Sequence, residues 1–248
     1  MSSKIDNYVQ NNGTKQNKSS FFVKFCMTKR VKSRLLYQLN FLKSIGYDYT
    51  NSVNLQLYDD EQLHLPNDLQ ALEEVAQNCH LCQLNKYRAN VLFGRGNSNA
   101  NIMFIGDEPN ISEDETGEFY AGRTGALLTK MIENVLEIRV NEVYITNLVK
   151  CKTSHNMVSN EDANSCRAFL LKQIELIKPK LIVALGETSY AYLTNDTSAF
   201  SKVRGTVLNQ NGLDVIPTFH PSFLLRNPTA KKEAYYDMLK IKSLMERM

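Results

Sequence analysis

Four of the five cysteines in this chain have a spacing that could hold a metal. They are Cys79, Cys82, Cys151 and Cys166, in the pattern C-x2-C-x68-C-x14-C, while Cys26 stands apart. Four thiolates suit either a structural zinc ion or an iron–sulfur cluster. A zinc ribbon usually carries two tight C-x2-C pairs, so the wider second pair favours a cluster. Four scattered buried cysteines are the simpler alternative.

Polar side chains at the ends of apolar runs form a second candidate site. Asp107 follows NIMFIG, Asn147 ends VYITN, and His220 follows VIPTF. The run LIVAL stops in the same way at Gly186 and Glu187. Ligands of open parallel sheets bind beyond the carboxyl ends of the strands. If these runs are parallel strands, a carboxylate, an amide and an imidazole meet at one edge of the sheet and indicate a site there.

The elements that must position these residues alternate along the chain. Four short apolar runs have the character of buried strands, at residues 101–109, 142–150, 180–187 and 214–221. Helical periodicity occurs between them at 124–138 and 160–179, and again at 231–245. Strands that alternate with crossover helices predict a three-layer α/β/α sandwich with a central, mostly parallel four-stranded sheet.

The N-terminal quarter is expected to differ from the rest. Residues 1–50 contain nine Lys or Arg against two Asp, although the whole chain has a net charge of only +3. Such an arm could follow a phosphate backbone, and a solvated tail explains it equally well. We expect residues 1–65 to be a basic, partly disordered extension with one helix at 32–50. Residues 66–248 are expected to form the α/β domain, with Asp68 capping its first helix.

The composition argues against a membrane or secreted protein. No apolar run approaches the roughly 18 residues that cross a bilayer. The N-terminus also lacks the apolar core of a signal peptide. We therefore expect a cytoplasmic protein, in which paired cysteines indicate metal ligation before disulfides.

Longer motifs around these residues resemble those of the family 4 uracil-DNA glycosylases. The C-x2-C pair is followed by LFGRGNSNANIMFIGDEPNISEDETGEFYAGRTGALLTKMI, then by VYITNLVKC, the fourth cysteine and TFHPSFLLRNP. The order is that of the family over about residues 70–243. The resemblance implies a base-excision repair enzyme that flips uracil out of DNA and hydrolyses its N-glycosidic bond, leaving an abasic site. It also implies that the four cysteines hold a structural [4Fe–4S] cluster.

The same resemblance implies roles in a base pocket. His220 would donate a hydrogen bond to uracil O2, where negative charge develops. Asn147 would pair with O4 and N3–H and reject cytosine. Tyr120, in GEFYAG where the family has G-x-P-F-V-G, would stack on the base, although Phe119 is the rival ring. Gly106 belongs to the same substrate-binding set.

Two carboxylates and one loop complete the expected site. The family motif GEAPG-x-x-E corresponds to GDEPNISED, so Asp107 and Glu113 would orient water or stabilise positive charge on the sugar. The run SFLLRNP resembles a loop that enters the minor groove. In it, Leu224 or Leu225 would fill the space left by the base. Arg226 and Ser222 would contact the DNA, and we expect the protein to act as a monomer.

Two other function classes are compatible with parts of the pattern. A catalytically impaired iron–sulfur DNA-binding protein could keep the fold and have lost its chemistry at GDEPN. A redox protein that carries a cluster is the other class, but that function would not explain the motif His220-Pro221-Ser222. The presence of both Asn147 and His220 argues against a pure binder.

Overall fold

The computed structural model describes residues 65–153, 157–210 and 212–248. The helix predicted at 32–50 and nearly all of the basic extension lie outside these residues. The proposed boundary between an extension and an α/β domain therefore stays a prediction. Among the described helices, none has the length and apolar character that crossing a membrane requires.

The described residues build one mixed sheet in the order β1-β3-β2-β4-β6-β5. Its four inner strands run parallel: β3 (Tyr144–Asn147), β2 (Ile102–Gly106), β4 (Leu181–Leu185) and β6 (Leu213–Thr218). This confirms the predicted four-stranded parallel core. Two short antiparallel strands, β1 (Arg95–Gly96) and β5 (Leu208–Gln210), extend it at its edges. They were not predicted, because two or three partly polar residues carry no strand periodicity.

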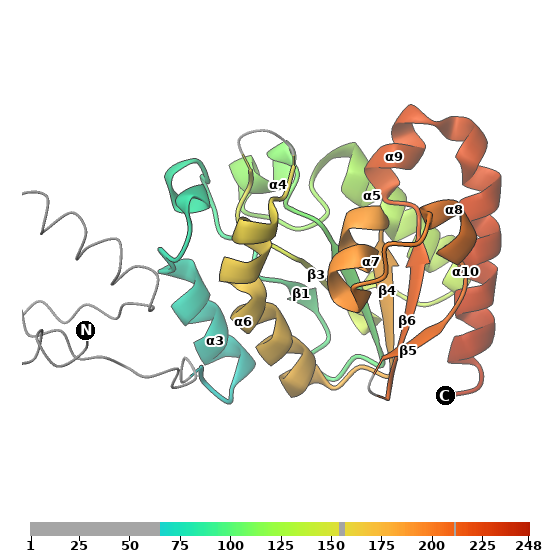
Figure 1. Cartoon of the computed structure of the whole chain (residues 1–248), viewed down its shortest axis with the longest axis horizontal. Helices are drawn as coiled ribbons and strands as arrows, with labels where there is room; N and C mark the ends of the chain where they lie inside the picture. The colour runs from blue at the N-terminus through green and yellow to red at the C-terminus, as the bar shows by residue number, and fades with distance from the viewer. Residues whose placement is uncertain (1–64, 154–156, 211) are drawn as a thin grey trace, which may run out of the picture. The chain divides into compact units, whose positions relative to one another are not determined.

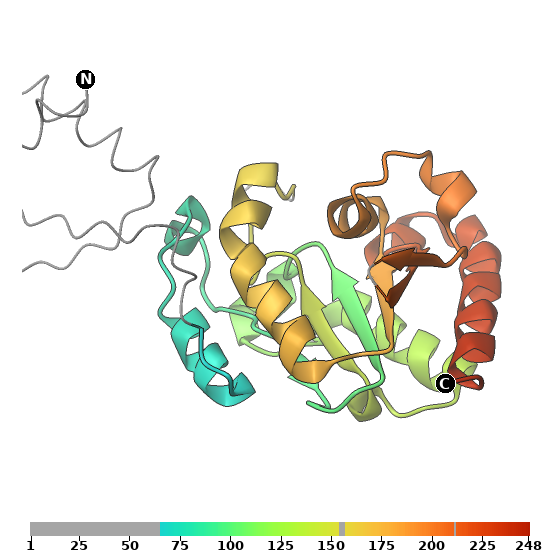
Figure 2. The same ribbon diagram turned by 60° about the horizontal axis from the view of Figure 1, so that its bottom comes forward.

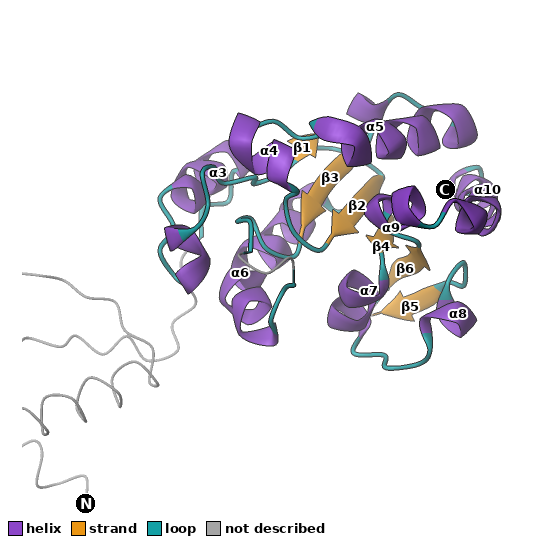
Figure 3. Ribbon diagram, turned by 90° about the horizontal axis from the view of Figure 1, so that it is seen from above, coloured by secondary structure: helices purple, strands orange, loops and turns teal. Residues whose placement is uncertain are grey.

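Helices cover both faces of the sheet, as Figure 3 shows from above. On one face lie α5 (Gly122–Met131), the π-helical turn η2 (Ile132–Leu136), α9 (Pro221–Arg226) and α10 (Lys231–Met245). On the other face lie α6 (Asn160–Ile177), α7 (Glu187–Thr194) and the short α8 (Phe200–Val203). The predicted three-layer sandwich is confirmed.

Two apolar cores follow from this layering. The alternating residues of β2 divide between them, with Phe104 packed against the α5 and α10 side and Met103 against the α6 and α7 side. A strand buried on both faces must be apolar at every position, which is why the runs read as continuous in the sequence. Figure 2 shows α6 and α10 on opposite sides of the strands.

A smaller apolar cluster forms beside the sheet, where α3 (Leu69–Gln77) packs on α6 (Figure 1). Asp68 caps α3 by accepting a hydrogen bond from the Ala71 N–H at 2.8 Å, as predicted. The remaining helical segments of the described residues are short: the six-residue helix α4 (Ile111–Thr116) and the 3-10 turns η1 (Gln83–Lys86), η3 (Val140–Glu142) and η4 (Pro228–Ala230). All four cysteines of the metal-like pattern belong to or flank this third cluster.

Candidate active site and metal centre

The strand ends bring an amide and an imidazole to the same point. Gly106 and Asn147 are register partners at the ends of β2 and β3. A Cβ atom on Gly106 would lie 2.5 Å from Asn147 Oδ1 and 3.6 Å from His220 Nε2. A side chain on Gly106 would therefore collide with the Asn147 amide, and it would lie in van der Waals contact with the His220 ring. Gly106 thus adjoins both of these side chains, and its assignment to the substrate-binding set stays a prediction.

A cavity opens where these side chains meet. Asn147 and His220 line it together with Phe119, Tyr120 and Leu128. Its other lining residues are both polar and apolar, and the polar ones include Glu108, Asn110 and Glu113. Aromatic walls together with hydrogen-bonding groups suit a flat ring that presents donors and acceptors at its edge.

His220 is held as a neutral donor. It is the N-cap of α9, and its Nδ1 accepts a hydrogen bond from the Ser222 N–H at 3.1 Å. The ring proton must then be on Nε2, the nitrogen that faces Gly106. Burial, together with the smaller effect of the positive charge of Arg226, lowers the pKa of His220 to about 4. The ring is therefore uncharged at neutral pH and offers an N–H to the cavity.

Asn147 has an anchored backbone and an unengaged side chain. It is buried with 7% of its surface exposed, and its carbonyl oxygen accepts a hydrogen bond from Lys150 Nζ at 2.8 Å. Its side-chain amide makes no hydrogen bond within the described residues. An amide in the wall of a cavity, with no partner of its own, can pair with a ligand that has matching donor and acceptor groups.

Asp107 is bound to the first turn of α7. Ser189 Oγ donates to Asp107 Oδ1 at 2.5 Å, and Gly186 separates the Asp107 carboxylate from His220. Burial raises the pKa of Asp107 to about 6, while hydrogen bonds from Ser189 and Thr188 limit the rise. The carboxylate therefore titrates close to neutral pH, as a group that orients or deprotonates water should. The sequence reasoning missed Ser189, although a serine two residues after the strand-ending Gly186-Glu187 could have suggested a polar contact there.

The neighbouring acids are tied to the backbone. Glu113 Oε2 accepts from the Asn110 N–H and Oε1 from the Tyr120 N–H, both at 3.0 Å. Burial raises the pKa of Glu113. Asp114 is buried and accepts from the Ala89 N–H at 3.0 Å. Glu113 thus lines the cavity while holding the loop that carries Tyr120.

Tyr120 lies in the cavity wall in a strained backbone conformation. Its φ is +68°, a region that side chains other than glycine rarely adopt. A Cβ atom on Gly125 would overlap the Tyr120 backbone, so this glycine permits the turn to pack on α5. The Tyr120 hydroxyl is buried without a partner among the described residues. Phe119 is also in the wall and joins the apolar core beneath it.

The residues of helix α9 that were expected to meet DNA differ in how far they are exposed. Leu224 is 1% exposed and packs in the core, whereas Leu225 is partly buried and Arg226 is exposed. Leu224 is therefore a core residue here, and only Leu225 of the predicted pair remains a candidate wedge. Phe223, which the sequence reasoning did not single out, is 36% exposed and stacks on Phe219 at 5.1 Å. Ser222 is bonded to His220, with its Oγ 2.7 Å from Nδ1.

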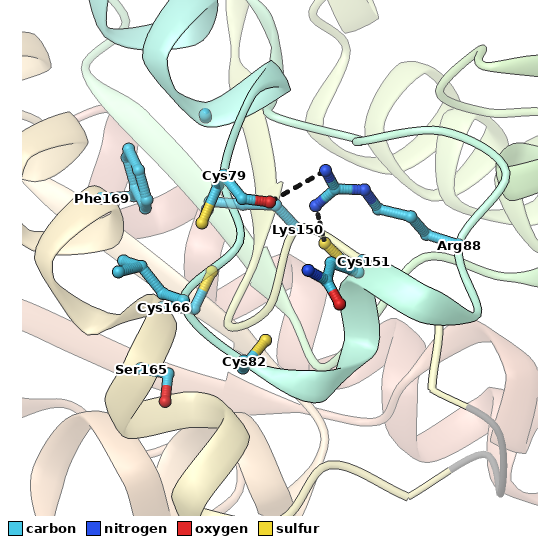
Figure 4. A pocket seen from close by; sticks show the side chains of 11 residues that line it. Cys79, Cys82, Arg88, Lys150, Cys151, Ser165, Cys166 and Phe169 are labelled. Carbon is cyan, nitrogen blue, oxygen red and sulfur yellow. Dashed lines mark hydrogen bonds between the residues drawn. The ribbon is translucent and has the colours of Figure 1, made fainter. Parts of the chain in front are cut away.

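The four cysteines line one cavity although they come from distant segments. Cys79 and Cys82 flank a turn after α3, Cys151 follows β3, and Cys166 lies in α6. Figure 4 shows their sulfur atoms directed toward a shared space. Arg88 Nη1 donates to Cys151 Sγ at 3.1 Å. The four cysteines of the sequence pattern therefore lie around one cavity.

The electrostatics of this cavity depend on what it holds. Burial raises the pKa values of the Cys82 and Cys151 thiols and raises that of Cys166 to about 11. A bound metal reverses this, because its positive charge stabilises thiolates. No group of three or more His, Cys, Asp or Glu within the described ranges converges closely enough to hold a single metal ion. A four-iron cluster needs thiolates that surround a larger volume than one tetrahedral zinc does.

Comparison with known proteins identifies the family. The model of the uracil DNA glycosylase superfamily matches residues 93–240. The type-4 uracil-DNA glycosylase of Thermotoga maritima is 38% identical over 196 residues, which are 77% of this chain and 99% of that protein. The chain belongs to the uracil DNA glycosylase superfamily. The family resemblance read from the motifs is confirmed.

Other members of the superfamily show how far the likeness extends. The type-4 uracil-DNA glycosylase of Saccharolobus solfataricus is 37% identical over 72% of this chain and 87% of its own length. The type-5 uracil-DNA glycosylase of Pyrobaculum aerophilum is 28% identical over 66% of this chain and 82% of its own length. The superfamily match runs from the residues before β2 into α10, so it contains all four inner strands and the cavity at their ends.

Proposed function

We propose that this protein is a DNA repair glycosylase that hydrolyses the N-glycosidic bond of deoxyuridine and leaves an abasic site. The observation that carries the proposal is that the Asn147 amide and the His220 ring both lie near Gly106 and line one cavity. The type-4 relatives, which are named uracil-DNA glycosylases, support the same reaction.

Recognition follows from the two polar groups. The base must leave the helical stack to enter this cavity. The Asn147 amide presents a donor to uracil O4 and an acceptor to N3–H. Cytosine carries an amino group in place of O4 and no hydrogen on N3, so both contacts would become unfavourable. The aromatic wall, of which Tyr120 is a part, stacks on the ring, a contact worth roughly 1 to 3 kcal/mol per base.

Bond cleavage follows from the neutral imidazole and the carboxylate. As the bond breaks, negative charge grows on the base, and the His220 Nε2–H donates to O2 without any change of protonation. A preorganised donor of this kind is worth roughly 3 to 4 kcal/mol in the transition state. Asp107, ionised above its pKa of about 6, orients water and faces the developing positive charge on the sugar. Glu113 positions the Tyr120 loop, since both of its oxygens already accept from backbone amides.

The partner is DNA that contains uracil, bound on the side of the molecule where α9 begins. The exposed Arg226 meets a phosphate, and the apolar Phe223 and Leu225 occupy the position left by the extracted base. Ser222 supports this surface by bonding to His220. We further propose that the protein acts as a monomer and in the cytoplasm, on DNA rather than at a membrane.

The four cysteines are proposed to hold a [4Fe–4S] cluster. Their common cavity and its apolar cover from Ala76 and Phe169 support this proposal, and the wide C-x14-C spacing of the second cysteine pair favours a cluster over zinc. When bound, the cluster supplies a structural cross-link between α3, the end of β3 and α6. Hydrolysis of the N-glycosidic bond transfers no electron, so no step of the reaction requires the redox chemistry of the cluster.

Activity on DNA separates this proposal from a catalytically impaired binding protein of the same fold. The test uses a duplex oligonucleotide with one uracil and its thymine-containing match, with enzyme in excess, followed by alkaline cleavage of abasic sites. We expect a cleaved strand only from the uracil substrate, and its loss with His220→Ala. Binding of both duplexes without cleavage would favour the impaired protein.

A further inference from the structure

Lys150 is a buried cation with no carboxylate beside it. Only 2% of its surface is exposed, and no Asp or Glu of the described residues forms an ion pair with it. Its ammonium group donates to Thr146 Oγ1 at 2.6 Å and to the Asn147 carbonyl oxygen at 2.8 Å. Both acceptors are neutral. A buried charge without an opposite charge is costly, so a lysine at this position points to an anionic group nearby.

The cysteine cavity supplies a place for that anion. Lys150 lines the same cavity as the four cysteines, and Figure 4 shows it among them. A cluster held by four thiolates carries a net negative charge. A second cation, Arg88, contacts the cavity from another side by donating to Cys151 Sγ at 3.1 Å and to the Cys79 carbonyl oxygen at 2.9 Å. The cavity is therefore lined by one partly exposed and one buried positive charge.

A short turn connects this cavity to the base pocket. It begins with Asn147 and ends with Cys151, and its backbone is fixed to β2 because the Leu148 N–H donates to the Gly106 carbonyl oxygen at 2.9 Å. The Lys150 carbonyl oxygen accepts from the Leu92 N–H at 2.8 Å. The side chain of Lys150 folds back across this turn to Asn147. One residue thus touches both the proposed cluster site and the residue that reads the base.

We propose that Lys150 is a positioning residue that serves as the internal counterion of the metal–thiolate group and makes the orientation of Asn147 depend on that group. The inference rests on the cluster and on the base-reading role proposed above. With the anion present, the ammonium group is neutralised and holds the Asn147 carbonyl. Without the ammonium group, the cluster is bound less firmly and the strand end that carries the amide is less well fixed.

The test compares Lys150→Met with Lys202→Met, using the proteins as purified with their metal. Methionine keeps the length and volume of the buried side chain but removes its charge. Lys202 is exposed on α8, so its replacement changes the net charge equally without touching the cavity. The three readouts are the rate at which visible absorbance is lost in excess chelator, the midpoint reduction potential of the bound cluster, and the ratio of uracil to cytosine excision.

For Lys150→Met we expect release at least ~10-fold faster, as the loss of a buried opposite charge demands. The reduction potential should become more negative, because the added electron is no longer offset by the ammonium group. The uracil-to-cytosine ratio should fall severalfold, while Lys202→Met matches the wild type in all three. If the methionine variant does not fold, Lys150→Gln gives the same comparison, since it keeps a donor but not the charge.

Each failure has a separate meaning. Unchanged release and potential in a folded Lys150 variant would overturn the counterion role. A changed potential with unchanged base discrimination would overturn the link to Asn147. Wild-type protein that binds zinc or no metal would contradict the proposed cluster, and with it this inference, whereas the excision assay tests the glycosylase activity independently.

Discussion

Replacing Ser189 by Ala should move the acid limb of the pH–rate profile toward higher pH. The Ser189 hydroxyl donates to Asp107 Oδ1 and also lies 2.9 Å from the Leu185 carbonyl oxygen. In the ionised state of Asp107 the hydroxyl donates to the carboxylate. In the protonated state Asp107 can donate to Ser189 Oγ while the hydroxyl turns to Leu185. Ser189→Ala loses both hydrogen bonds with Asp107, and the one to the ionised carboxylate is the stronger.

The size of the shift follows from the difference between the two states. A hydrogen bond to a charged acceptor contributes about 1.5 to 3 kcal/mol, and a neutral one about 0.5 to 1.5 kcal/mol. Their difference is about 1 to 1.5 kcal/mol, and one pKa unit corresponds to about 1.4 kcal/mol. The pKa of Asp107, raised by burial to about 6, should therefore rise by about one further unit in the variant. Because the carboxylate is the active form, excision is lost as the pH falls through this pKa.

The assay is the single-turnover rate of uracil excision measured between pH 4.5 and pH 8.5. The limb should lie near pH 6 in the wild type and near pH 7 in Ser189→Ala, with similar rates at the alkaline plateau. Ser201→Ala, an exposed serine on α8, serves as the matched control and should leave the limb in place. A limb at the same pH in Ser189→Ala and wild type would refute the assignment of Asp107 as the titrating group.

Four further variants test the other parts of the site. His220→Ala should lower the single-turnover rate by about 100- to 1,000-fold with little change in DNA affinity, because the lost donor acts mainly in the transition state. Asn147→Asp should weaken uracil excision and admit cytosine at low pH, where the buried carboxyl is neutral and can donate to cytosine N3, with the gain fading as it ionises. Leu224→Ala should lower the free energy of unfolding by about 2 to 5 kcal/mol, as measured by chemical denaturation, because it empties a core position. Leu225→Ala should instead weaken excision from duplex DNA with a smaller loss of stability.

Each of these expectations has a result that would contradict it. An unchanged rate in His220→Ala would remove the imidazole from the mechanism. Uracil excision by Asn147→Asp at the wild-type rate would place base reading elsewhere. A stable Leu224→Ala variant that fails only on duplex DNA would restore Leu224 as the wedge and place its side chain outside the core when DNA is bound.

The strands and main helices could be predicted because their patterns are physically forced. Both faces of the inner strands are covered, so each had to be apolar throughout, and α6 and α10 repeat their apolar residues with helical period. Helix α7 was not predicted, since the stretch ETSYAYLT is short and mixes polar with β-branched residues. Ser189, which lies in this helix, was not predicted either, because its role depends on a contact with Asp107, which is 82 positions earlier in the chain.

Site residues could be predicted where the residue type and its place in the sequence pattern indicate a location in the fold. They could not be predicted where their contacts depend on the path of a loop or on the orientation of a short helix. Cysteines at metal-like spacing and polar residues at strand ends predicted two clusters. The four cysteines line one cavity and Asn147 and His220 line another, whereas Asp107 lies near His220 but does not line that second cavity. The sequence could not show that the Glu113 carboxylate is occupied by backbone amides, because that depends on the path of the loop to Tyr120. Nor could it show which leucine of α9 faces the core, since a six-residue helix has no periodicity to read.

The most direct test of the central claim is the release of free uracil from DNA. The purified protein is incubated in molar excess with an oligonucleotide that contains one uracil, and both free uracil and the abasic strand are quantified by mass spectrometry. We predict the two products in a one-to-one ratio that approaches one per substrate strand, and neither product from the thymine-containing match. Strand binding with no free uracil at any pH between 6 and 8.5 would contradict the claim that this pocket cleaves the glycosidic bond.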